Sequence, residues 1–275
     1  MNAAIDKRID KRQVRRAFSR AAANGRPPPV AVVAQRLLSR LDEITITPEV
    51  MADIGGGGCP ALAEKYADAK MLAVDFALPV LRFDDGGGRE VWRVLADAEK
   101  LPLADGSVDL AYSNLCLEWT DAGAALSEAA RVLRPGGVFV FSTLGPDTLR
   151  EMRAAFDGRV HLFADMHDIG DMLAPRGFSE PVMQREEIRL TYSHPEDAAR
   201  EVHQWGGGFT DAKRRRGLGG KSRWQKCLSA YPREEEDGRY AATFEIIYAL
   251  AWRAESGGGA KPVRFFPRSV YNAKL

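Results

Sequence analysis

Cysteine is scarce in this sequence, with three residues among 275. Cys59, Cys116 and Cys227 lie far apart and form no CxxC or Cys-His spacing, which a disulfide framework or a zinc site would need. The four histidines stand in separate segments and show no metal-ligand spacing either. We therefore expect no metal and a reduced, cytoplasmic environment.

The sequence also lacks a long apolar run and an excess of either charge. No run reaches the roughly 18 apolar residues of a membrane span, and the N-terminal segment MNAAIDKRIDKRQVRRAF has no apolar stretch typical of a signal peptide. Lysine and arginine total 39 against 38 aspartates and glutamates, a net charge of +1. This balance argues against a protein that coats nucleic acid, although local basic patches are compatible with it. We expect a soluble protein with no membrane and no nucleic-acid partner.

The chain begins with a segment that predicts an N-terminal helical arm at residues 1–28. Ile5, Ile9, Val14 and Phe18 have the spacing of one apolar helix stripe within an otherwise charged sequence. The run GRPPP then interrupts the helix. Such a stripe predicts a helix that docks on another part of the molecule.

From residue 50 onward, short apolar runs alternate with amphipathic segments. The apolar runs predict buried strands at 50–54, 71–75, 91–97, 108–114 and 138–143. Helices are expected at 30–41, 59–67, 121–133, 146–157 and 167–175. This alternation is typical of βαβ units around a parallel sheet. We expect an α/β, Rossmann-like, doubly wound domain with a mostly parallel sheet.

The last third of the chain departs from this alternation. Residues 181–192 and 242–252 predict two more strands, which make seven and pair antiparallel at one edge of the sheet. The segment at about 195–232 is too long for a plain connection and predicts a helical lid insertion. Residues 256–275, with three glycines and scattered arginine and proline, predict a flexible tail. The main domain is then expected at 29–255.

The strongest local motif is VMADIGGGG at 50–58. It predicts an apolar strand with Asp53 near its end, followed by a glycine turn and then a helix. Residues without a Cβ let a ligand touch the backbone at such a turn and at the helix N-terminus that follows. The alternative is a plain structural turn in which Asp53 caps the helix.

Two more acids follow strands downstream. Asp75 ends the second predicted strand, where a carboxylate can accept hydrogen bonds from both hydroxyls of a ribose. Asp97 ends the third, within LADAEKLPLADGSVDLAYSN, where an acid can accept a hydrogen bond from an adenine amino group. The alternative for Asp97 is an ordinary turn residue.

In their order, these motifs resemble the class I S-adenosylmethionine-dependent methyltransferases: ADIGGGG, AVD, LADAEKLPLADGSVDLAYSN and RVLRPGGVFVFST. The resemblance covers about residues 48–192 and implies S-adenosylmethionine as the cofactor. It also implies which residues contact that cofactor. Those residues are Asp53, Gly55 and Gly57 at the methionine end, Asp75 at the ribose, Asp97 and the Ala98 backbone at the adenine, and Asn114 and Leu115 on the sulfonium side.

Segments outside the shared motifs resemble one branch, the malonyl-acyl-carrier-protein O-methyltransferases of biotin synthesis. They are DKRQVRRAFSRAAAN, SNLCLEWT, FSTLGPDTLREMRAAF, FADMHDIGDMLAPRGFSEPVM and DGRYAATFEIIYALAW. The resemblance implies methyl transfer to the free carboxylate of a malonyl thioester on acyl carrier protein. Three positions depart from the family pattern: Cys59 replaces the usual third glycine, Gly25 stands where tyrosine is common, and Glu118 where glutamine is common.

Methyl transfer to a malonyl carboxylate needs few acid-base residues, because the malonyl carboxyl group, with a pKa near 4, is already ionised at pH 7. The nucleophile needs placement and the exclusion of water. We predict that Arg150, just past the fifth strand, steers the substrate carboxylate, since strand ends form the ligand crevice and arginine binds carboxylates bidentately. A solvated helix arginine is the alternative. Trp119 and Trp205 are candidate walls of the same crevice.

Basic residues concentrate in the predicted lid of this near-neutral protein. They predict contact with an acidic carrier protein or with the phosphate of its prosthetic arm. A solvated charge run is the alternative. The residues are Lys213, Arg214, Arg215, Arg216, Lys221 and Arg223.

Two other functions fit the sequence. The same fold can methylate another small acid or acyl thioester, since one fold serves many substrates. A catalytically silent assembly factor, similar to the mitochondrial complex I assembly proteins, is a rival of a different class. Cys59 and the absent tyrosine favour this rival, whereas Asp75, Asp97 and the lid favour an enzyme.

Overall fold

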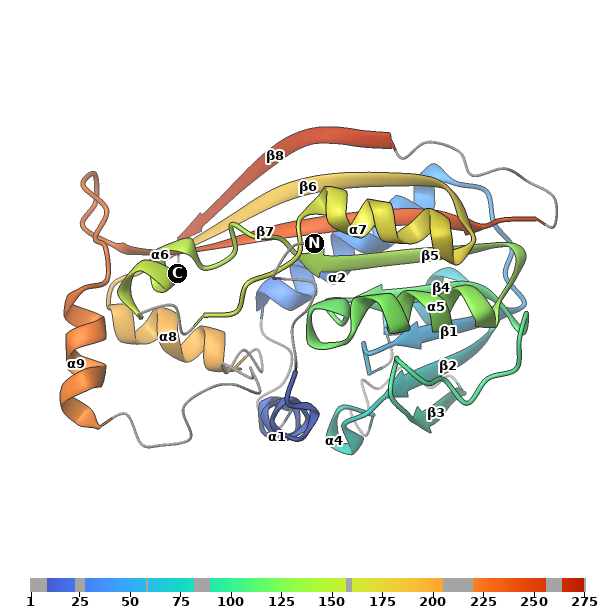
Figure 1. Cartoon of the computed structure of the whole chain (residues 1–275), viewed down its shortest axis with the longest axis horizontal. Helices are drawn as coiled ribbons and strands as arrows, with labels where there is room; N and C mark the ends of the chain where they lie inside the picture. Colours follow the sequence, from blue (N-terminus) through green and yellow to red (C-terminus); the bar gives the residue numbers. More distant parts are fainter. Residues whose placement is uncertain are drawn as a thin grey trace.

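The computed structural model describes residues 9–22, 28–57, 59–81, 90–156, 160–204, 220–255 and 264–274. At its centre is an eight-stranded sheet in the order β3-β2-β1-β4-β5-β7-β6-β8 (Figure 1). The first five strands are parallel: β1 (Val50–Ile54), β2 (Lys70–Asp75), β3 (Val91–Leu95), β4 (Val108–Asn114) and β5 (Leu133–Leu144). The strand order reverses between β1 and β4, so the predicted Rossmann-like doubly wound sheet is confirmed.

The two predicted edge strands are also confirmed as an antiparallel pair. Strand β7 (Tyr240–Arg253) lies between β5 and β6 (Phe178–Tyr192) and runs antiparallel to both. Together, β1 to β7 give the seven strands that the sequence predicts.

The prediction of a flexible tail is wrong for the end of the chain. Residues Arg264–Lys274 form β8, which pairs parallel to β6. The outer edge of β6 presents backbone groups that pair readily with another strand. The register shifts between Gln184 and Glu186, opposite Pro267, and an irregularity of this kind tolerates a proline, which has no N–H to donate. The three glycines at 257–259 and the prolines at 262 and 267 concealed the strand from sequence reasoning.

Helices cover both faces of the sheet. On one face, α2 (Pro28–Ser39) and α3 (Pro60–Lys65) pack into one apolar cluster, while α5 (Ala122–Val132) and α7 (Met166–Leu173) pack into a second cluster on the other face (Figure 1). The chain passes directly from α5 into β5, with Gly136 at φ +79°. The sequence LRPGG predicts this change of direction, because only glycine adopts such a φ without strain.

The remaining helices lie around the carboxyl ends of the strands. They are α1 (Lys11–Ala21), α4 (Leu78–Leu81), α6 (Arg150–Ala155), α8 (Pro195–Gln204) and α9 (Lys221–Ser229). Of the 3-10 turns, η3 (Leu117–Trp119) follows β4, whereas η2 (Arg40–Glu43) precedes β1 and η4 (Ala174–Arg176) precedes β6. Helix α1 packs against α4 and α8. In the described ranges, no helix is long and apolar enough to cross a membrane.

Helices α8 and α9 lie within the predicted lid at 195–232. Residues 205–219, including Trp205 and the basic run at 213–216, lie outside the described residues. The same is true of Gly25 in the arm. The predictions that rest on these residues stay predictions.

Candidate active site

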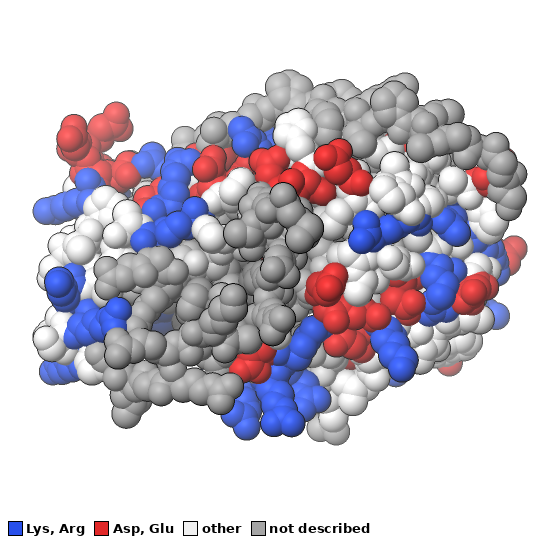
Figure 2. Space-filling view, in the orientation of Figure 1, with Lys and Arg blue, Asp and Glu red and all other residues white. Residues whose placement is uncertain are grey.

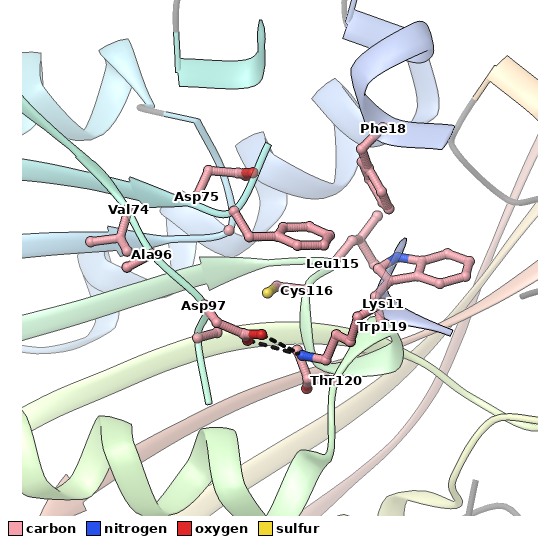
Figure 3. A pocket seen from close by; sticks show the side chains of 13 residues that line it. Lys11, Phe18, Val74, Asp75, Ala96, Asp97, Leu115, Cys116, Trp119 and Thr120 are labelled. Carbon is pink, nitrogen blue, oxygen red and sulfur yellow. Dashed lines mark hydrogen bonds and ion pairs between the residues drawn. The ribbon is translucent and has the colours of Figure 1, made fainter. Parts of the chain in front are cut away.

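An open cavity of about 410 Å³ lies at the carboxyl ends of the first four strands (Figure 3). Gly55 follows β1, Asp75 ends β2, Asp97 follows β3, and Leu115 and Cys116 follow β4. The cavity therefore stands at the point where the strand order reverses, the usual ligand crevice of a doubly wound sheet.

The structure brings together most of the residues that the resemblance assigns to the cofactor. Gly55, Asp75, Asp97, Ala98 and Leu115 line this cavity. The other three cofactor residues are not part of the lining. These three are Asp53, Gly57 and Asn114.

The glycine turn has a shape that only glycine permits. Gly55 and Gly57 adopt φ of +77° and +69°, and a Cβ on Gly55 would overlap the Cys116 sulfur. Asp53 is fully buried beneath the turn, where its carboxylate occupies the space that a Cβ on Gly56 would need. Asp53 therefore shapes the turn from below.

Cys59 departs from the family's glycine pattern without disturbing the turn. Its φ is −104°, a conformation open to any residue, and it stands at the N-cap of α3. Its carbonyl accepts hydrogen bonds from the backbone N–H groups of Leu62 and Ala63, both at 3.1 Å. The local backbone therefore does not require glycine at this position.

Asp75 presents a fixed carboxylate to the cavity. Its side chain is 5% exposed, and Oδ1 accepts a hydrogen bond from the Ala77 backbone N–H at 2.7 Å. This hydrogen bond orients the Asp75 carboxylate before any ligand binds. Such preorganisation reduces the entropy lost on binding.

Asp97 has a partner that the sequence did not predict. Lys11 of α1 donates to both Asp97 carboxylate oxygens, at 2.9 and 3.0 Å, and also pairs with Glu99 at 2.5 Å (Figure 3). Burial alone would lower the pKa of Lys11, but hydrogen bonds and charge from Glu99 and Asp97 outweigh it and raise that pKa. The arm thus supplies a permanent cation at the end of the cavity assigned to adenine.

Asn114 anchors the loop after β4 without lining the cavity. Its Oδ1 accepts from the Ser142 hydroxyl at 2.8 Å, and its Nδ2 donates to the Val30 carbonyl at 3.3 Å. Leu115 then turns into the cavity wall with φ +51°, and its N–H donates to the Ser142 hydroxyl at 3.0 Å. A left-handed leucine is a strained conformation of the kind that clusters at binding sites.

The Cys116 thiol stays protonated beside this strained residue. Burial raises its pKa, and the negative charges of Asp75 and Glu118 raise it further. A thiol held neutral is a poor nucleophile. Cys116 therefore acts as a packing residue under Gly55.

Trp119 separates the first cavity from a second cavity of about 470 Å³ and lines both. Phe18 of α1 contacts the Trp119 ring edge-on at 5.7 Å between ring centroids, and His161 does so at 5.4 Å. The second cavity is largely apolar, with Leu144, Val202 of α8 and other side chains in its wall. The tryptophan predicted as a wall thus stands between two compartments.

The second cavity has two polar side chains in its described lining, Thr148 and His161. The Thr148 hydroxyl is already bound, because it donates to the Glu245 carbonyl and accepts from the Glu245 N–H, both at 3.1 Å. His161 is 4% exposed.

A third cavity, of about 420 Å³, shares Leu144 with the second cavity. It is also lined by Glu118, whose Oε2 accepts a hydrogen bond from the Thr143 hydroxyl at 3.2 Å.

Arg150 does not line any of these three cavities. Its guanidinium makes two hydrogen bonds to the Glu187 carboxylate, both 3.1 Å, and lies 3.5 Å from Glu151. These contacts join α6 to β6. The Arg150 guanidinium is thus ion-paired and not merely solvated, and its predicted role toward substrate stays a prediction.

Sequence reasoning missed Lys11 and His161 as site residues and left the target of Phe18 unspecified. The apolar stripe of the arm was the signal for Phe18, and the structure shows that this residue docks on Trp119. Lys11 gave no signal, since a lysine on a charged helix is ordinary. In the part of the chain that the structure describes, no group of three or more possible ligands could hold a metal ion.

Comparisons with known proteins agree with this geometry. Residues 52–141 match a family model described as a methyltransferase domain. The malonyl-[acyl-carrier protein] O-methyltransferase of Gallionella capsiferriformans is 42% identical over 265 residues, covering 89% of this chain and 91% of that protein. The protein of the same name from Nitrosospira multiformis is also 42% identical, with 89% and 90% covered.

Among solved structures, the YcgJ protein of Bacillus subtilis superposes with a TM-score of 0.57 at 16% identity, covering 81% of this chain and 100% of that one. At that identity, the similarity shows the fold alone. The relatives at 42% identity span nearly the full length of both chains. This chain therefore belongs to the malonyl-[acyl-carrier protein] O-methyltransferase family, within the class I S-adenosylmethionine-dependent methyltransferases.

Proposed function

We propose that this protein methylates the free carboxylate of a malonyl thioester carried by acyl carrier protein, an early step of biotin synthesis. The observation that carries the proposal is the pair of cavities that meet at Trp119. The first cavity has the carboxylates of Asp75 and Asp97 in its lining, which suit a nucleoside, and the second cavity is largely apolar. Full-length relatives that bear this activity in their names support the same assignment.

The residues of the first cavity fit S-adenosylmethionine. Gly55 brings its backbone into the cavity wall, where Cys116 leaves no space for a Cβ. Asp75 and Asp97 offer carboxylate oxygens to the hydroxyl and amino donors of an adenosine. Leu115 and Cys116 provide the wall on the side of Trp119. When bound, the cofactor supplies a methyl group on a positively charged sulfur.

The second cavity suits an anionic substrate that must lose its water shell. A carboxylate is a weaker nucleophile when hydrated, and apolar walls such as Leu144, Met152 and Phe244 exclude water from it. The protein then needs to aim the carboxylate toward Trp119 and the first cavity. Positioning of this kind contributes most to a reaction that needs no base.

His161 is the group that we assign to substrate positioning. An imidazole N–H can donate to the malonyl carboxylate or to the thioester carbonyl, and the ring is held edge-on against Trp119. Thr148 is bound to the backbone of β7 and serves the wall. Arg150 remains a second candidate that would have to leave Glu187 to reach a substrate.

The rival of a catalytically silent assembly factor rests on the departures at Cys59 and Gly25. The backbone at Cys59 has an ordinary φ, so this departure gives no reason for a defective turn. Asp75 and Asp97, which a silent protein has no need to keep, both line the first cavity. These observations favour an enzyme.

The test of this proposal compares carriers that differ only in the acyl group. Formation of S-adenosylhomocysteine should be fast with malonyl carrier and absent with acetyl carrier, which has no free carboxylate. The monomethyl ester of malonyl carrier serves as the matched control and should also be inert. Equal rates with all three, or none with malonyl carrier, would contradict the proposal.

A further inference from the structure

The outer face of α1 carries a row of exposed arginines. Arg12, Arg16 and Arg20 recur every four residues, are exposed, and have Arg15 exposed beside them. In the described part of the chain, none of these four side chains makes a salt bridge. Figure 2 shows the resulting basic cluster at the lower edge of the molecule, where α1 lies in Figure 1. The row spans about 12 Å at 1.5 Å per residue.

This arrangement acts against the stability of the helix itself. Like charges four residues apart destabilise a helix by about 0.2–0.5 kcal/mol per pair. The first turn contains no acidic residue, although the positive end of the helix dipole favours one there. Asp10 caps the helix but stands before its first residue. A partner that brings negative charge would relieve both effects.

The opposite face of the same helix belongs to the active site. Lys11 and Phe18 line the first cavity, Val14 is fully buried, and Phe18 contacts Trp119. A helix with its side chains is about 10 Å thick. A protein bound on the arginine row therefore stands one helix away from the wall that the two cavities share.

We propose that the row Arg12, Arg16 and Arg20, with Arg15, is the docking face for the acidic acyl carrier protein. The inference rests on the proposed function, which requires the carrier to hold its acyl arm at the second cavity. A row of exposed cations matches an acidic partner, because complementary charge steers the encounter of two proteins and fixes their register. The net charge of the whole chain is only +1, so this face stands out from its surroundings.

The test reverses two charges and keeps the helix. Arg12→Glu with Arg16→Glu preserves helix propensity, since glutamate and arginine are similar in this respect. The matched control, Lys70→Glu with Arg93→Glu, makes the same change in net charge on exposed residues of β2 and β3. Both variants, and the unaltered protein, are assayed with malonyl carrier and with a small malonyl thioester.

We expect the KM for malonyl carrier to rise about tenfold in the α1 variant, with kcat within about twofold, because exposed charges at an interface mainly change encounter and its salt dependence. The small thioester and the affinity for S-adenosylhomocysteine should be unchanged. The control variant should resemble the unaltered protein. An unchanged KM for the carrier, an equal rise in the control, or an equal loss with the small thioester would overturn the proposal.

Direct titration of the carrier into the protein separates this proposal from the proposed function. Carrier binding that is lost in the α1 variant supports the docking face even where no methyl transfer occurs, and in that case only the reaction assignment fails. If the charge reversal releases the protein from phosphatidylglycerol vesicles and leaves carrier affinity unchanged, the face binds a membrane surface and the proposal is wrong.

Discussion

Replacing Asp75 with asparagine tests the cofactor cavity most cleanly. Oδ1 of Asp75 accepts from the Ala77 N–H, and an asparagine keeps an oxygen for that hydrogen bond. The other carboxylate oxygen becomes an NH₂ group, which cannot accept from a ribose hydroxyl. Asp75→Asn should therefore weaken the cofactor site and leave the turn intact.

The magnitude follows from the loss of hydrogen bonds to a charged acceptor, about 1.5–3 kcal/mol. The dissociation constant for S-adenosylhomocysteine should rise roughly tenfold to a hundredfold, since about 1.4 kcal/mol is a factor of ten. The unfolding midpoint should hardly move. Asp75→Ala, which leaves the buried Ala77 N–H without its acceptor, should lose a further 1–3 kcal/mol or so of stability.

Calorimetric titration gives the dissociation constant for S-adenosylhomocysteine, and thermal unfolding of the same samples gives the stability. The matched control is Asp109→Asn at the opposite end of the sheet, where Asp109 accepts from the Glu49 and Val50 N–H groups and pairs with Arg134. This control should lower stability and leave affinity unchanged. Unaltered affinity in Asp75→Asn would refute the assignment of Asp75 to the ribose.

Three further predictions test other parts of the site. His161→Ala should lower kcat/KM for malonyl carrier roughly tenfold or more, while S-adenosylhomocysteine binds normally. His161→Gln, which keeps an N–H donor, should recover part of the loss. Equal activity in the unaltered protein and both variants would remove His161 from the substrate site. Gly57→Ala should lower the free energy of unfolding by about 1–2 kcal/mol, because alanine is strained at φ +69°. Adding Val80→Ala should recover only the stability lost through overlap of the new Cβ with the Val80 side chain. An unchanged denaturation midpoint in Gly57→Ala would contradict this account. Because its pKa is raised, Cys116 should stay a thiol from pH 7 to about 9 and react with iodoacetamide far more slowly than a free cysteine. Mass spectrometry of the labelled peptide measures this rate, and labelling at the free-cysteine rate would contradict the raised pKa.

The fold could be predicted from the sequence because its signals are local. Each parallel strand is a short apolar run, and Asp75 and Asp97 stand where strand ends place them in one crevice. Strand β8 could not be predicted, since its pairing depends on the exposed edge of β6, which lies some 80 residues earlier in the chain.

The site was predicted less completely than the fold. The resemblance supplies positions in the motifs, but it does not say which side chains reach the cavity and which support it from behind, as Asp53 and Asn114 do. The pairing of Lys11 with Asp97 joins residues 86 positions apart, and no local pattern encodes such a contact. Prediction therefore ends where tertiary packing decides the outcome.

The most direct test of the account is mass spectrometry of malonyl carrier after incubation with this protein and S-adenosylmethionine that carries a deuterated methyl group. We predict the addition of one labelled methyl group, located by fragmentation on the free carboxyl end of the malonyl unit. A carrier of unchanged mass, or a label found on the carrier polypeptide, would contradict the proposed function.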